Sequence, residues 1–408
     1  MNAGDRFFDV AENVRLKMIE DATPINTRKR NNWSFKLFQQ WIEWKKAKWA
    51  KDGGFLMVLK EFEEYDASDL NFLLQDFVIS VRKEDRSEYP PSSLRSITAG
   101  ILSTFRDKYH KQWDFFKDAQ FQSARRALDA KMRELTRRGV GLNRRKAQVI
   151  TQEMEEELWN HGDLGSDDPQ TLLNTLLYLL GIHFALRSRE EHRHLRFGSD
   201  SQLQLGMKDN IEYLQYREDC SKTRHGGLKD RFIPPKEGIV FADANVPEER
   251  NLVCLYKKYA SLRPKYGKCN AFYLKPLKNK KADIWYADQP IGINTISKIV
   301  KGMIKEEGHF TNHSLRRTAV SRLNGGGFSI EAVKKRTGHR TSEGVMAYDQ
   351  RNDKDLRKES NALYGIPENA KVATYSSDFC NSTEMNADNP LRGAFLQNCT
   401  INVNYYSK

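Results

Sequence analysis

Apolar residues at helical spacing dominate the first third of the chain and constrain its fold more than any other feature of the sequence. One set follows Ser68, a residue type that often caps a helix: Leu70, Leu73, Leu74, Phe77, Val78 and Val81. A second set follows the start signal Pro90–Ser93: Leu94, Ile97, Ile101, Leu102 and Phe105. We therefore predict one helical domain over residues 25–136, after an N-terminal extension at 1–24.

Aromatic residues gather in an earlier part of this predicted domain. The segment carries six large apolar residues: Trp33, Leu37, Phe38, Trp41, Ile42 and Trp44. The tryptophans could stack on nucleic-acid bases, but their spacing favours packing in a small helical core.

The chain is long and strongly basic. Its 408 residues correspond to about two to four domains. It has 67 Lys and Arg against 54 Asp and Glu, and a formal net charge of +13 favours a polyanionic partner. No apolar run approaches the ~18 residues of a membrane-spanning helix, and the N-terminus carries no signal-peptide core. The five cysteines form no CxxC pair, so neither a disulfide framework nor a structural zinc site is expected. These features predict a soluble intracellular protein.

Positive charge concentrates between the two halves of the chain, where residues 101–150 hold thirteen Lys and Arg against five Asp and Glu. The dense part flanks Gly139 and Gly141 and contains seven basic residues: Lys131, Arg133, Arg137, Arg138, Arg144, Arg145 and Lys146. Residues 137–149 could be a solvated linker. Because they join two folded blocks, we favour a basic arm that lies along phosphates and is flexible at its glycines.

The second block starts near residue 150 and mixes helices with a small sheet. Asp168 and Pro169 form a start signal for an apolar helix that runs from Leu172 towards Phe184. Strand-like stretches follow at 202–205, 211–216 and 231–234, and helical spacing returns at 248–262, 293–305, 314–324 and 329–336. These patterns predict a domain at 150–366 and a mainly α protein with a small antiparallel β-sheet. The polar segment 367–408 is expected to be an extended or disordered tail.

Six residues of the second block form an ordered series that suits phosphoryl-transfer chemistry: Arg187, Lys222, His313, Arg316, His339 and Tyr348. His313 and Arg316 are three apart, which places both on one face of a helix. Arginine offers forked donors to the non-bridging oxygens of a phosphodiester, and a tyrosine can hold the phosphoryl group covalently. Tyrosine has an ordinary pKa of about 10, so such a nucleophile needs cations and a base nearby. The series requires neither a metal nor a nucleotide cofactor.

The series resembles that of the tyrosine recombinases, or phage-type integrases. Their catalytic domain carries in order an Arg, a Lys on a β-hairpin, HxxR, a His or Trp, and a Tyr, and all six positions are filled here. Three segments are more narrowly similar to the recombinases of Crypton DNA transposons: REDCSKTRHGG, WYADQPIGINTISKIVKGM and TNHSLRRTAV. The resemblance spans roughly residues 25–350. It implies that 25–136 is a helical core-binding domain and that 150–366 is an α+β tyrosine-recombinase catalytic domain.

The resemblance also implies a role for each residue. Tyr348 would attack the scissile phosphate, form a 3′-phosphotyrosine and release a 5′-hydroxyl. Arg187 and Arg316 would hold the non-bridging oxygens, and His339 would assist them. Lys222 would protonate the leaving oxygen, while His313 would assist proton transfer at the nucleophile.

The first arginine has two possible registers. In the family a Glu follows this arginine three residues later, which fits Arg187 and Glu190, and a register with Arg189 and Glu191 is the alternative. Glu190 is expected to be a buried carboxylate that holds a nearby arginine. His192 and His194 lie in a charged run and are expected at a solvated or DNA-facing surface.

The predicted function is therefore that of a site-specific DNA recombinase or transposase of a Crypton-like mobile element. Double-stranded DNA is the implied partner, and strand exchange between two duplexes implies a homotetramer, with no cofactor, no membrane association and a nuclear location. Two alternatives remain open. One is a recombinase-derived DNA-binding or transcriptional protein that does not cleave, and the other is a nicking-closing enzyme like a type IB topoisomerase.

Overall fold

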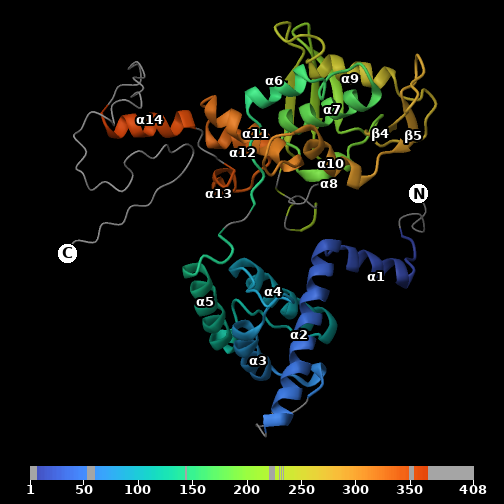
Figure 1. Cartoon of the computed structure of the whole chain (residues 1–408). Helices are drawn as coiled ribbons and strands as arrows, with labels where there is room; N and C mark the ends of the chain where they lie inside the picture. Colours follow the sequence, from blue (N-terminus) through green and yellow to red (C-terminus); the bar gives the residue numbers. More distant parts are fainter. Residues whose placement is uncertain are drawn as a thin grey trace, which may run out of the picture. The chain divides into compact units, whose positions relative to one another are not determined.

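The computed structural model describes residues 7–52, 60–142, 145–219, 226–228, 230, 232, 234–348 and 353–365. The chain divides into two compact units, Met1–Lys146 and Ala147–Lys408, and each unit has its own hydrophobic core (Figure 1). In the described residues the protein is mainly helical with two small antiparallel sheets, which confirms the predicted fold class. No described helix is both long and apolar enough to cross a membrane.

Every regular element described in the first unit is a helix. Its elements are α1 (Glu12–Asp21), α2 (Ile25–Asp52), η2 (Phe62–Glu64), α3 (Ala67–Ser80), α4 (Pro91–Tyr109), η3 (Ala119–Phe121) and α5 (Gln122–Arg137). Helix α2 packs against α4, and α3 packs against α5 (Figure 1). All the apolar residues that the spacing assigned to the helices at 70–81 and 94–105 are buried between these elements, so this part of the helical prediction is confirmed.

The predicted cap of α3 is wrong. Asp66, not Ser68, caps the helix: its carboxylate accepts the N–H of Asp69, and the Asp69 carboxylate accepts the N–H of Asp66 in return. This reciprocal pair satisfies two N–H groups that have no partner within the helix.

The expected core packing of the tryptophans holds for only one of the three. Trp41 is buried, but Trp33 and Trp44 are 48% and 52% exposed. Positions 33 and 44 are eleven residues apart, which is about three helical turns, so both lie on one face of α2. That face is turned away from the buried Phe38 and Ile42.

The second unit is built around one apolar helix, α7 (Pro169–His183), which is buried along most of its length. Its helices are α6 (Gln152–Asn160), α7 (Pro169–His183), α8 (Ser188–Arg193), α9 (Leu252–Ser261), α10 (Ile293–Met303), α11 (Asn312–Gly325), α12 (Ile330–Thr337), α13 (Ser342–Met346) and α14 (Asp353–Leu363). Its strands are β1 (Leu203–Lys208), β2 (Ile211–Arg217), β3 (Glu237–Phe241), β4 (Leu274–Pro276) and β5 (Tyr286–Pro290). Asp168 caps α7 through its carboxylate, and Pro169 occupies the first turn, as predicted.

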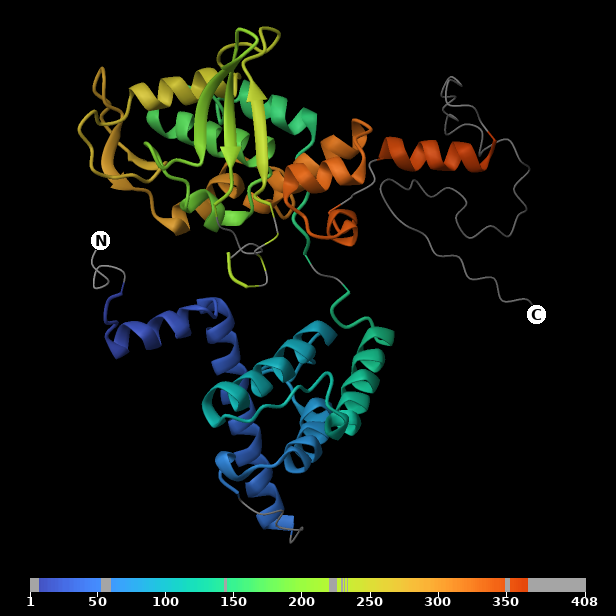
Figure 2. The ribbon, with the colours of Figure 1, turned by 180° about the vertical axis from the view of Figure 1, so that it is seen from behind.

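The larger sheet has the order β1-β2-β3, with antiparallel neighbours (Figure 2). Leu205 pairs with Leu214, and Tyr216 pairs with Gly238. The third strand, β3, begins at Glu237, after the predicted stretch 231–234. Arg231 and Ile233 of that stretch lie outside the described residues. Helix α9 packs on β2 and β3.

Close packing of α7 against α11 places the functional part of this unit. A Cβ atom at Gly181 would lie 2.4 Å from Leu315 Cδ1, so only glycine allows this approach. Leu315 is fully buried at the contact, and the Thr311 hydroxyl caps α11 by accepting the N–H of His313. The packing holds the first two turns of α11 beside the C-terminal end of α7.

Candidate active site

Tyr348 is the point at which the predicted series comes together. It follows the C-terminal end of α13 and is partly buried against Val320, Val333 and Val345. Its ring centroid lies 5.0 Å from that of His313 and 4.8 Å from that of His339. The guanidinium carbon of Arg316 is 5.8 Å from the same ring. Three predicted residues therefore surround one phenol, two of them from α11 and one from the turn after α12.

Arg316 is fully buried at the centre of this cluster. Its Nη1 donates to the carbonyl oxygen of Ala185 at 2.7 Å, and its Nη2 donates to His339 Nε2 at 3.1 Å. Its Nε is also buried and has no acceptor among the described residues. Burial, then the charge of Arg187, lowers the pKa of Arg316 to about 10. The site thus holds a buried guanidinium whose hydrogen-bonding capacity is not fully used. A bound anion would stabilise such a group.

Helix α12 delivers His339 to the cluster. Gly338 ends the helix in the left-handed conformation, with φ of 70°, and the chain then turns towards Arg316. Because Arg316 donates to His339 Nε2, the ring proton lies on Nδ1 and is donated to Thr337 Oγ1 at 2.6 Å. Burial and the neighbouring Arg316 and Arg187 lower the pKa of His339 to about 3, so the imidazole is neutral at pH 7.

Arg187 belongs to the cluster, whereas Arg189 does not. Arg187 precedes α8, and its charge lowers the pKa values of both Arg316 and His339, after burial and other contacts. Arg189 has a side chain that is 47% exposed and pairs with Glu190 at 3.6 Å. The structure therefore places Arg187, and not Arg189, near Arg316 and His339.

The buried carboxylate next to these arginines is Glu191, and the expectation for Glu190 is wrong. Glu191 accepts the backbone N–H of Arg187 at 2.7 Å and pairs with the ammonium of Lys236 at 3.2 Å. Burial alone would raise the pKa of Glu191, but Lys236, the Arg187 N–H and Arg316 together hold it below its ordinary value. One turn of α8 points position 191 inward and leaves position 190 at the surface.

Arg317 and Lys236 were missed by the sequence reasoning. The guanidinium carbon of Arg317 lies 5.8 Å from the Tyr348 ring, and Arg317 Nη2 donates to the carbonyl of Ala347 at 3.4 Å. Arg317 is buried, and its Nε has no acceptor within the described part of the chain. Its adjacency to HxxR was the only available signal. Lys236 stands in the segment PPKEG, which gave no sign of a functional residue.

Lys222 lies outside the described residues, so the series is placed here without it. His194 is exposed, as expected, but the expectation for His192 is wrong. His192 is fully buried, and its Nδ1 hydrogen-bonds the hydroxyl of Tyr273 at 2.9 Å. Burial lowers the pKa of His192 to about 3 and keeps it neutral. The charged residues around His192 suggested a surface position, but in the six-residue helix α8 its side chain points inward.

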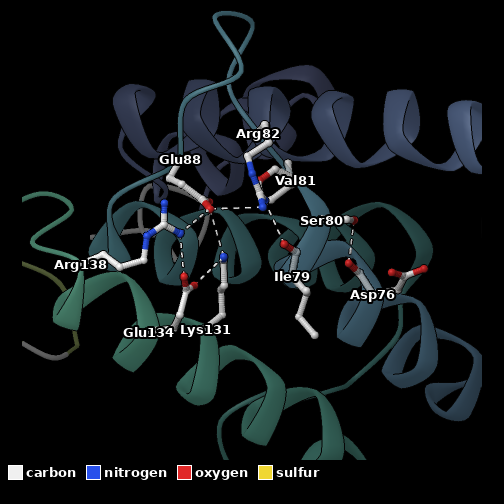
Figure 3. Close-up of polar contacts among 9 residues, drawn as sticks. All are labelled: Asp76, Ile79, Ser80, Val81, Arg82, Glu88, Lys131, Glu134 and Arg138. Atoms are coloured by element: carbon white, nitrogen blue, oxygen red, sulfur yellow. Dashed lines mark hydrogen bonds and ion pairs between the residues drawn. The ribbon is translucent and has the colours of Figure 1, made fainter.

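Lys131, Arg133 and Arg137 lie within α5, so these three basic residues are held on a helix and the predicted flexible arm does not begin at Arg137. Figure 3 shows that Lys131 pairs with Glu88 and Glu134, at 3.1 and 2.7 Å. Arg138 pairs with the same two carboxylates, at 3.2 and 2.6 Å.

These ion pairs divide the predicted basic residues into two groups. The Lys131 side chain is 9% exposed and is held inside the first unit. Arg133 pairs with Asp129 along the helix. Arg137, Arg145 and Lys146 are exposed, and Arg144 lies outside the described residues. The exposed cations are the better placed of the seven for contact with phosphates.

Comparison with known proteins gives one family match and several distant relatives. A family profile described as "Domain of unknown function (DUF3504)" matches residues 149–305. The human "Uncharacterized protein KIAA1958" is 27% identical over 249 residues, which cover 59% of this chain and 33% of that protein. Human "Zinc finger MYM-type protein 2" is 24% identical over 286 residues, or 64% of this chain and 20% of that protein. The chain thus spans a third or less of the length of these curated relatives.

The chain is also similar to solved structures of DNA recombinases. An integrase of the Tn1549 transposon in complex with transposon right-end DNA is 14% identical, covers 86% of this chain and 98% of its own, and has a TM-score of 0.41. XerH site-specific recombinase bound to difH is 14% identical, covers 73% of this chain and 78% of its own, and has a TM-score of 0.33. A lambda integrase dimer bound to a COC′ core site is 13% identical, with 77% and 80% coverage and a TM-score of 0.30.

Proposed function

We propose that this protein cleaves and rejoins DNA strands through a covalent link to Tyr348. The observation that carries the proposal is the position of Arg316, a buried cation whose Nε has no acceptor in the described part of the chain, next to a phenol that two histidines also contact. A phosphodiester in this position would supply the missing acceptor. Its transition state carries additional negative charge, which preorganised guanidinium donors stabilise.

The proposed reaction conserves the phosphodiester bond. The Tyr348 oxygen attacks phosphorus and its proton passes to His313, while the bond from phosphorus to the 5′ oxygen breaks. The 5′ oxygen takes a proton from Lys222 and leaves as a hydroxyl. The DNA 3′ end is then held as a phosphotyrosine, and attack by a 5′-hydroxyl reverses each step. The roles of Lys222 and His313 follow from the resemblance of the series to tyrosine recombinases.

The finer parts of the proposal rest on the sequence. The net charge of +13 suits double-stranded DNA, and exchange between two duplexes would need four copies of the chain. The segments similar to Crypton recombinases support a role in moving such an element, which would place the protein in the nucleus.

Covalent trapping tests the proposal. Duplexes that bind the full chain are first selected from a random-sequence pool and are then incubated with wild type, Tyr348→Phe and Tyr364→Phe. Wild type and Tyr364→Phe are expected to give a protease-sensitive adduct on a denaturing gel. Tyr348→Phe should give none, although it binds DNA with unchanged affinity. Tyr364 is a matched control because it is 80% exposed and follows α14.

The outcomes separate the alternatives. DNA binding without an adduct from the wild-type chain would contradict cleavage and would favour a recombinase-derived DNA-binding protein. An adduct together with relaxation of supercoiled plasmid, but without recombinant products, would favour a nicking-closing enzyme. An adduct from Tyr348→Phe would show that another residue is the nucleophile.

A further inference from the structure

Lys236 lies beneath the site and belongs to no predicted motif. It immediately precedes β3, and its side chain is only 2% exposed. Its ammonium pairs with Glu191 at 3.2 Å and lies 5.2 Å from the ring centroid of Tyr216. A charged group is costly to bury unless it is paired and hydrogen-bonded, and Lys236 meets this requirement through Glu191.

Three segments that carry site residues meet at this lysine. Through Glu191 it is connected to the backbone N–H of Arg187. Its ammonium is 3.5 Å from the carbonyl oxygen of Ala185, which also accepts the 2.7 Å hydrogen bond from Arg316. Its stem lies under Gly338, where an added Cβ would be 3.1 Å from Lys236 Cδ. The next residue in the chain is His339.

The backbone at Ala185 is a second, independent sign. Ala185 has a φ of 46°, in the left-handed region that residues with a Cβ rarely adopt. Strained backbone of this kind is concentrated at functional sites and persists only where its surroundings hold it. Here the conformation directs one carbonyl oxygen towards both Arg316 and Lys236.

Charge explains what the lysine does. Glu191 is a buried carboxylate close to Arg316, and its charge raises the pKa of Arg316 against the lowering by burial and by Arg187. If Lys236 were absent, Glu191 would lack its cationic partner and would compete with the scissile phosphate for the guanidinium of Arg316. We propose that Lys236 is a positioning residue, which neutralises Glu191 and thereby keeps Arg187 and Arg316 available to the phosphate. This inference rests on the proposed function.

Suppression by a second substitution tests the mechanism. Adduct formation is measured at saturating DNA, at a temperature where circular dichroism shows every variant folded. Lys236→Met should slow cleavage by about 10²–10³, as for loss of one transition-state donor, with the DNA dissociation constant unchanged. Adding Glu191→Gln removes the competing carboxylate and should restore most of the rate. Lys236→Arg keeps the charge and should lose less than tenfold. Lys257→Met, which breaks an exposed pair with Glu212, is the matched control and should cleave normally.

A modified substrate separates positioning from proton donation. A duplex with sulfur in place of the 5′-bridging oxygen has a leaving group that needs no proton. This substrate should not restore Lys236→Met, and rescue would overturn the inference by making Lys236 the acid. Unchanged cleavage by a folded Lys236→Met would also overturn it, as would failure of Glu191→Gln to suppress the defect.

Phosphate binding tests the same inference without catalysis. If the wild type forms no adduct, the proposed function fails, and thermal unfolding in inorganic phosphate then decides the role of Lys236. Phosphate should raise the melting temperature of wild type more than that of Lys236→Met. Adding Glu191→Gln to Lys236→Met should bring back the larger rise. An equal rise in all three proteins would overturn the inference.

Discussion

Replacement of Arg316 by Met should separate stability from activity. Arg316 is fully buried, and its pKa is lowered from 12.5 to about 10, chiefly by burial and by Arg187. At 1.36 kcal/mol per pKa unit, holding this buried charge costs roughly 3 kcal/mol. Met removes that cost but leaves Ala185 O and His339 Nε2 without their donor, at about 1–3 kcal/mol each. The two effects nearly cancel, so the free energy of unfolding should change by no more than about 3 kcal/mol.

Activity should respond very differently. Loss of one transition-state donor typically costs about 2.7–4 kcal/mol, so Arg316→Met should cleave about 10²–10³ times more slowly. Urea unfolding followed by circular dichroism gives the stability, and adduct formation gives the rate. Arg263→Met is a matched control because Arg263 is also buried but donates to the carbonyls of Cys269, Ala271 and Phe272. It should keep its cleavage rate. The reasoning would be refuted if Arg316→Met lost more than about 4 kcal/mol of unfolding free energy, or if it cleaved DNA at the normal rate.

Three further predictions follow from the placement of individual residues. Arg187→Ala should slow adduct formation by about 10²–10³ while Arg189→Ala stays near wild type, and the reverse result would move the register by two residues. Arg137→Gln should flatten the dependence of log affinity on log salt by up to about 0.9. Arg138→Gln should flatten it less, because two carboxylates already pair with Arg138, and equal effects would contradict this division. His192 has a pKa of about 3 in the folded chain, so the unfolded chain binds more protons below pH 6.5 and stability falls as the pH is lowered. His192→Gln should reduce that slope between pH 6.5 and 4 by up to about 1.4 kcal/mol per pH unit, and an unchanged slope would show that His192 is not buried neutral.

Local patterns in the sequence predicted the helices well. The apolar positions at 70–81 and 94–105 are all buried, and Asp168 and Pro169 start α7 as expected. Periodicity identifies a helix because the buried apolar residues recur every three or four positions along it. The third strand was misplaced because a short strand repeats too few times to mark its own ends, and the two sheets were not distinguished.

The candidate site was predictable only as a set of residue types. The order of Arg, HxxR, Gly-His and Tyr identified Arg316, His339 and Tyr348, which the fold then brought together. The sequence did not reveal Lys236, which stands in no recognisable motif, and it offered Glu191 only as the partner of Arg189 in the alternative register. Their importance arises from burial and from contacts across 45 residues of chain.

The sequence by itself determined the helical character, the excess of positive charge and the chemical type of the site, since these depend on composition, periodicity and residue identity. Tertiary structure alone decided which of these charges are available. Lys131 and Arg138 are neutralised by Glu88 and Glu134, whereas Arg316 is buried and, among the residues that the structure describes, its Nε meets no acceptor. A charge acts through its distance to other charges and through its exposure to water, and both are set only when distant segments pack together.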